Sequence, residues 1–63
     1  MKNRLLNGEM IELTNGFDSI SIWFQEKTNN FCLELNAKVI KATKTWKPIK
    51  NKLEQLGELT EAE

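Results

Sequence analysis

Apolar and polar side chains alternate along most of the stretch from Ile11 to Val39, and this period of two is the strongest constraint on the fold. Successive side chains of a β-strand point to opposite faces, so the alternation predicts strands with one buried face. The residues of that predicted buried face are Ile11, Leu13, Ile20, Ile22, Phe24, Phe31, Leu33, Leu35, Ala37 and Val39. The first two thirds of the chain are therefore expected to form a sheet.

The first turn of this sheet is predicted at Asn15-Gly16. An Asn-Gly pair between two alternating segments is typical of a tight type I′ hairpin, because both central residues of that turn need positive φ. A two-residue turn at this position pairs Ile11 with Ile20. The apolar side chains of both strands then lie on one face, as a correct register requires.

The second turn is predicted at Asn29-Asn30, where polar residues separate two apolar segments. This turn places Phe24 opposite Leu35. Alternation over residues 31–39 is unbroken, which predicts one continuous third strand.

After residue 43 the spacing of the apolar residues changes to three and four, the period of an amphipathic helix. The residues at this spacing are Trp46, Ile49, Leu53 and Leu56. Thr45 is the predicted N-cap, because Pro48 then falls in the first turn, where a helix needs no N–H partner. Gly57 is the predicted end of the helix. We expect this helix to cover the apolar face of the sheet, with Trp46 as the largest single side chain of that cover.

These features together predict an α+β fold, a three-stranded antiparallel β-meander with one C-terminal amphipathic α-helix packed across one face. Residues 2–6 precede a second Asn-Gly pair and could add a short N-terminal strand. We expect one small domain over residues 1–57 and an acidic, frayed tail over residues 58–63.

Residue types that carry catalysis and metal binding are scarce. The chain has one cysteine and no histidine or tyrosine, and its glycines form no phosphate-binding loop. We therefore expect a protein that is not an enzyme and has no catalytic residues, metal site or cofactor. A chain of 63 residues also has little room for a small-molecule pocket. No apolar run is long enough for a membrane span or a secretion signal, which predicts a cytoplasmic protein without membrane contact.

The second face of the predicted sheet is mostly polar but carries Trp23. Exposed apolar patches on small proteins often mark contact surfaces, and tryptophan is enriched at binding hot spots. The predicted partner-binding residues are Trp23, Ser21, Asn36, Lys38 and Ile40. The alternative is that N-terminal residues, including Leu5 and Leu6, fold back over this face and bury the tryptophan.

The function predicted from these features is that of a small non-enzymatic binding module, most simply a protein–protein regulator, inhibitor or accessory factor. Its composition, rich in asparagine and lysine, is compatible with a phage or mobile-element origin. Self-association as a homodimer through the same face is another option.

Residues 38–52 contain six lysines and no acidic residue, whereas residues 53–63 contain four glutamates. The lysines are Lys38, Lys41, Lys44, Lys47, Lys50 and Lys52. The later members of this set spread over the polar side of the predicted helix, which is an ordinary solvated surface. The alternative function is nucleic-acid binding, in which these lysines contact phosphates and Trp23 on the open sheet face stacks on a base.

Two short stretches resemble known families. In VIKATKTWKPIKNKL, the spacing of Trp46, Ile49 and Leu53 resembles the strand-to-helix join of the single-strand-binding transcriptional coactivators, whose long basic connection before the last strand is missing here. TWKPIKN is similar to the TWxPxxN phrase of chromodomains, whose aromatic cage would fall at Leu35 and Lys38, so the methyl-lysine site is missing. Each resemblance covers less than half of the chain, and neither identifies it.

Overall fold

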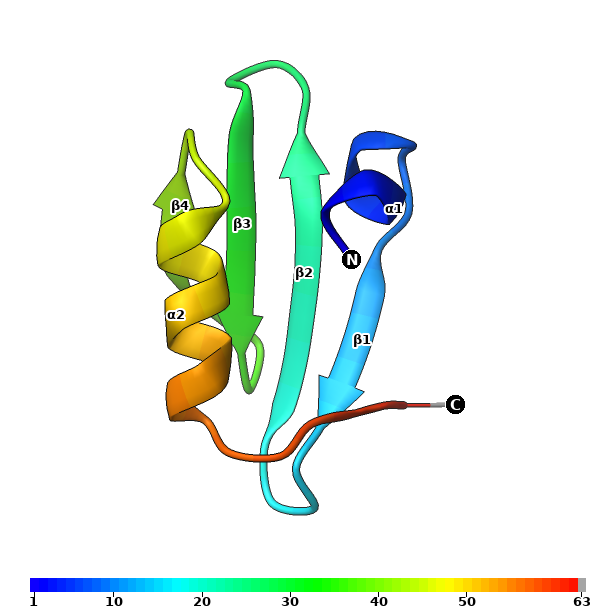
Figure 1. Cartoon of the computed structure of the whole chain (residues 1–63), viewed down its shortest axis with the longest axis vertical. Coiled ribbons are helices and arrows are strands. Elements are labelled where there is room, and N and C mark those ends of the chain that lie inside the picture. Colours follow the sequence, from blue (N-terminus) through cyan, green and yellow to red (C-terminus); the bar gives the residue numbers. More distant parts are fainter. Residues whose placement is uncertain (63) are drawn as a thin grey trace.

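The computed structural model describes residues 1–62 of the 63-residue chain. The elements are, in chain order, α1 (Lys2–Leu6), β1 (Ile11–Thr14), β2 (Ser19–Gln25), β3 (Asn30–Leu35), β4 (Lys38–Thr43), α2 (Lys47–Gln55) and β5 (Thr60–Glu61). All strands join one five-stranded antiparallel sheet with the order β4-β3-β2-β1-β5. Figure 1 shows β4, β3, β2 and β1 side by side in this order. The predicted α+β class and antiparallel sheet are confirmed, but the sheet has two more strands than expected and a second helix is present.

Both helices lie on the same face of the sheet and cover one core (Figure 1). Helix α2 packs over β3 and β4, and α1 packs against β2. The buried core cluster consists of Leu5, Ile11, Leu13, Ile20, Ile22, Phe31, Leu33, Ile49 and Leu53. Trp46 packs against this core with its ring edge-on to Phe31, the ring centroids 5.5 Å apart. The prediction that the C-terminal helix covers the apolar face is therefore confirmed in part, because α2 covers β3 and β4 while α1 packs on β2. No helix of residues 1–62 covers the other face.

Residues 2–6 form helix α1 and not the short strand suggested by the nearby Asn-Gly pair. This segment has no alternation that could give a strand one apolar face, and its two leucines are adjacent. Leu5 is fully buried in the core on the helix-covered face, and Leu6 stays exposed. The alternative in which Leu5 and Leu6 bury Trp23 is therefore wrong.

The register between β1 and β2 differs from the prediction by two residues. Ile11 pairs with Ile22 instead of Ile20. The connection spans residues 15–18, because the side-chain oxygen of Asn15 accepts hydrogen bonds from backbone N–H groups two and three residues ahead, at 2.9 and 2.8 Å. Such an Asx turn is a local alternative to the tight two-residue hairpin. An even shift keeps every side chain on its predicted face.

The register between β2 and β3 also shifts by an even number of residues. Phe24 pairs with Phe31, where Leu35 was expected. The turn lies at residues 26–29 and ends at Asn29, whose φ is 55°. Positive φ is tolerated better by asparagine than by most other residues. The predicted faces of both strands are again preserved.

The predicted continuous third strand is in fact a hairpin of β3 and β4. Asn36 and Ala37 connect these strands with φ of 51° and 68°. Positive φ at both central residues is the geometry of a type I′ turn. The sequence pattern does not indicate this turn, because Ala37 and Val39 continue the apolar alternation of the preceding strand. Both residues are exposed, so their predicted places on the buried face are wrong.

Helix α2 begins at Lys47 with Trp46 in the N-cap position, and no side chain caps it. The predicted N-cap Thr45 therefore lies one residue too early. Gly57 follows the helix with φ of 90°, in agreement with its predicted role at the helix end.

The C-terminal segment crosses in front of β2 and reaches β1 (Figure 1). There Thr60–Glu61 forms β5, and the N–H of Ala62 donates to the carbonyl oxygen of Glu12 at 2.9 Å. The part of the expected frayed tail that the structure describes thus includes a paired strand. Glu63, the last residue of that predicted tail, lies outside the described residues.

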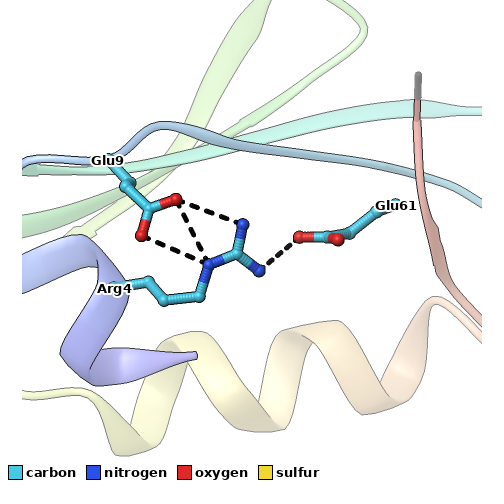
Figure 2. A network of polar contacts seen from close by, with 3 residues as sticks. All are labelled: Arg4, Glu9 and Glu61. Atoms are coloured by element: carbon cyan, nitrogen blue, oxygen red, sulfur yellow. Dashed lines mark hydrogen bonds and ion pairs between the residues drawn. The ribbon is translucent and has the colours of Figure 1, made fainter.

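Arg4 of α1 connects the N-terminal helix to β5 (Figure 2). Its Nε donates to both carboxylate oxygens of Glu9 at 3.3 Å, and its Nη1 donates to Glu61. Hydrogen bonds to Glu61 and then to Glu9 raise the pKa of Arg4. Surface ion pairs add little stability, so we expect the main effect of this contact to be on the position of β5.

Candidate functional site

The helix-free face of the sheet carries a row of apolar side chains at its centre. Trp23 of β2 pairs with Cys32 of β3, and Cys32 pairs with Ala42 of β4. Directly opposed residues of neighbouring strands lie on the same face. Continuing the β1–β2 register by one residue places Met10, which is 57% exposed, beside Trp23. We call Met10, Trp23, Cys32 and Ala42 the apolar row.

A more polar row runs beside the apolar row. Ser21 of β2 lies between Glu12 of β1 and Glu34 of β3, and Glu34 pairs with Val39 of β4. Val39 is 52% exposed. The two carboxylates give this part of the face a negative charge, which opposes contact with a phosphate backbone.

Cys32 is the only thiol of the chain and is buried beside the half-buried Trp23. Desolvation raises the pKa of the Cys32 thiol. The protonated thiol is a weak nucleophile, so this buried residue serves as an apolar side chain within the row. Within residues 1–62, no three His, Cys, Asp or Glu side chains gather into a group that could hold a metal ion.

The structure brings together only part of the predicted partner-binding set. Trp23 and Ser21 lie on the helix-free face, as their alternation predicts. Asn36 lies in the β3–β4 turn, where its Oδ1 accepts from the N–H of Ser19 at 2.9 Å and its Nδ2 donates to Asp18 at 2.9 Å. The side chain of Asn36 therefore joins two turns of the fold.

Lys38 and Ile40 occupy places that the sequence did not predict. Lys38 pairs with Leu35 and so belongs to the helix-covered side of the sheet, and the expectation that it faces the same way as Trp23 is wrong. Ile40 is the extra residue of a β-bulge in β4 and is 37% exposed at the sheet edge. Both displacements follow from the hairpin that divides the predicted third strand.

The six predicted phosphate-contacting lysines do not form one stripe. Lys41 of β4 and Lys47 and Lys52 of α2 line an open groove of about 480 Å³ between the strand and the helix. Lys50 lines a separate open groove of about 570 Å³ on the other side of α2, next to Trp46. The sequence analysis expected little room for a pocket in so short a chain. Open, shallow grooves between neighbouring elements still form in a chain of this length.

The other two lysines of the set lie near the two ends of β4. Lys38 is its first residue and is exposed. Lys44 follows the strand, and its Nζ donates to the carbonyl oxygen of Thr28 at 3.1 Å. The lysine-rich segment thus places lysines along the edge strand β4 and on two sides of α2.

Comparison with protein-family models, with curated proteins and with solved structures found no significant match. The two short resemblances in the α2 region therefore gain no support. None of the helices in the described chain has the length and apolar character needed to span a membrane.

Proposed function

We propose that this chain is a small non-enzymatic protein-binding module, a regulator or accessory factor, whose contact surface is the helix-free sheet face centred on Trp23. The observation that carries the proposal is the apolar row. Both helices lie on the opposite face, yet a tryptophan, a cysteine and an alanine meet at the middle of the uncovered one.

The composition of this face supports a protein partner. Protein interfaces combine an apolar centre with a polar rim and are enriched in tryptophan and methionine. The apolar row supplies the centre, and Ser21 and Glu34 supply part of the rim. Tryptophan at such a centre commonly carries a large share of the binding energy.

Trp23→Ala tests the proposal, with Phe17→Ala as its matched control. Phe17 is 95% exposed in the β1–β2 connection, whereas Trp23 is half-buried. Both variants remove an aromatic ring, but only the ring of Trp23 lies on the sheet face. The purified chain is immobilised, and proteins captured from nuclease-treated extract of its native host are quantified by mass spectrometry. We expect at least one captured protein to fall tenfold or more with Trp23→Ala and to remain with Phe17→Ala.

A second variant keeps this test decisive if loss of the half-buried ring unfolds the chain. Ser21→Arg adds a long charged side chain to the same face beside the apolar row without removing a core contact. Equal capture by the wild type and by a folded variant of this face would refute the proposal. Sedimentation velocity on the same samples would reveal a homodimer as a mass that falls when the face is altered.

Nucleic-acid binding remains a second candidate, because Lys41, Lys47 and Lys52 converge on one groove, and none of the residues that line it is acidic. Three neutralised phosphates of a single strand would give a log–log salt slope of about −2. A labelled single-stranded oligonucleotide should then bind at low salt and lose binding with Lys41→Glu. An absence of any shift at low salt would exclude this candidate.

A further inference from the structure

Strand β4 presents an open edge to the surroundings. The sheet order places β4 at one end, with β3 as its one neighbour in the described chain, whereas β5 lies at the opposite end (Figure 1). Leu35 and Lys38 flank the two-residue turn and are the pair that exchanges backbone hydrogen bonds there. The N–H and C=O of the next residue, Val39, therefore point away from β3. Its side chain and that of Ile40 are exposed at the same edge.

The chain segment that forms and follows this edge is basic, although Glu34 of β3 pairs with Val39 on the helix-free face. No acidic residue occurs between Leu35 and Leu53 in the sequence. The lysines that lie on β4, just after it or across the groove from it are Lys38, Lys41, Lys44, Lys47 and Lys52. An unpaired strand edge and a positive field thus coincide.

Neither the chain itself nor a second copy fits this edge. The acidic C-terminal segment is held at the other edge, where β5 pairs with β1. An antiparallel pair of two β4 strands would bring the lysines of both copies into one short ladder, and like charges opposed across strands are destabilising. Lysines along an edge strand are a feature that opposes pairing between identical edges.

We propose that β4 binds an extended acidic segment of a partner protein, which adds to the sheet as a sixth strand. This inference rests on the proposed function in that the partner is a protein, but it uses the sheet edge and not the Trp23 face. In strand addition, main-chain hydrogen bonds supply affinity and alternate side chains supply specificity. The position of α2 over β3 and β4 makes the two faces of the added strand different.

The two faces predict the pattern of the bound segment. Side chains on the α2 side would lie next to the groove of Lys41, Lys47 and Lys52, which favours aspartate or glutamate. Side chains on the helix-free side would lie next to Val39 and Ala42, which favours apolar residues. The geometry therefore fits acidic and apolar residues in strict alternation.

A nine-residue fluorescent peptide of alternating glutamate and valine provides a direct probe, with fluorescence anisotropy of the full chain as the readout. In a second peptide the backbone nitrogens of all glutamates are methylated, and in a third those of all valines are methylated. In a β-strand these two sets of N–H groups point to opposite edges, so only one of the two peptides should lose binding, by tenfold or more. An alternating lysine–valine peptide should not bind.

Two variants of the chain complete the test. Val39→Pro removes the outward N–H, and proline is tolerated on an edge strand where the N–H faces solvent. Lys41→Glu reverses one charge of the groove. We expect each to weaken binding of the glutamate–valine peptide tenfold or more, while Lys27→Glu, the same charge change in the exposed β2–β3 turn, leaves it unaltered.

Equal binding of both N-methylated peptides, or of the lysine–valine peptide, would overturn the inference. Tighter binding of a single-stranded oligothymidine that competes for Lys41 would replace it with nucleic-acid binding. If Val39→Pro fails to fold, the methylated peptides and Lys41→Glu still test whether β4 binds the peptide. Failure of the proposed function shows separately, since that depends on Trp23→Ala and protein capture, whereas this peptide assay depends on the edge.

Discussion

Replacing Ala37 with glycine should stabilise the fold. Ala37 has φ of 68° in the β3–β4 turn, in the left-handed region that residues with a Cβ avoid. Its side chain is exposed, so its removal leaves no cavity in the core. Glycine adopts the same backbone conformation without the steric cost, and Ala37→Gly therefore relieves strain in the native state.

The size of the gain follows from two opposing effects. The left-handed conformation costs a residue with a Cβ about 1–2 kcal/mol. Glycine loses more backbone entropy on folding, which offsets about 0.4–1 kcal/mol of that gain. With the middle of each range, the net increase in the free energy of unfolding is about 0.8 kcal/mol. For a domain of this size the melting temperature should rise by roughly 2–8 °C.

Thermal melting followed by circular dichroism, together with urea unfolding, measures this change. Ala42→Gly serves as the matched control, because Ala42 is an exposed alanine in the strand β4 that the same turn leads into. Glycine within a strand costs about 0.5–1 kcal/mol, so this variant should melt at a lower temperature. If Ala37→Gly melts at or below the wild-type temperature, the turn is not strained in the way described.

Three further outcomes test the core, the β5 contact and the buried thiol. In urea titrations, Leu5→Ala should lower the free energy of unfolding by about 2–5 kcal/mol, enough to unfold much of so small a domain. Leu6 is one residue away and exposed, so Leu6→Ala should change the free energy of unfolding by less than about 0.5 kcal/mol. Arg4→Gln should speed hydrogen exchange at the Ala62 amide and leave the melting temperature of the whole fold nearly the same. If the exchange rate at Ala62 does not change, the ion pairs do not position β5. Burial raises the pKa of Cys32, so its alkylation by iodoacetamide should be slower in the folded chain than in urea. As the pH rises through the folded pKa, the wild type should lose more stability than Cys32→Ala, because the unfolded thiol ionises more readily. Equal alkylation rates would contradict the burial of this thiol.

The faces of the sheet were predictable from the sequence, although the registers were not. Alternation specifies only whether a residue points to the core or away from it. The partners of Ile11 and Phe24 were each misassigned by an even number of residues. An even shift changes the partner of each residue but not its face. The predicted place of Trp23 and the core of β1–β3 therefore stood, while the turns moved.

The elements that the sequence did not reveal lack local signals. The Asn36-Ala37 turn has no glycine at its second position, so β3 and β4 looked like one strand. Helix α1 is a five-residue helix with no side-chain cap, and the buried Leu5 stabilises it through tertiary packing. Strand β5 has two residues and depends on β1, a partner far away in the sequence.

The candidate site was accordingly predictable in part. Trp23 and Ser21 follow from alternation within β2 alone. Lys38 and Ile40 were misplaced, and the contribution of Ala42 was missed, because all three depend on where the hairpin turns and on the bulge in β4. Asn36 was the one residue that could have indicated the turn, since asparagine adopts positive φ more readily than most residues.

The path of the C-terminal third over the sheet has a consequence for the order of folding (Figure 1). The hairpins of β1 to β4 close over short loops, whereas the contact of Thr60 with Thr14 joins residues 46 positions apart. Closing that longer loop costs more chain entropy, so we expect β5 to dock after the folding transition state. Thr60→Ala should then accelerate unfolding and leave the rate of folding unchanged, and a slower folding rate in stopped-flow measurements would show instead that β5 docks early.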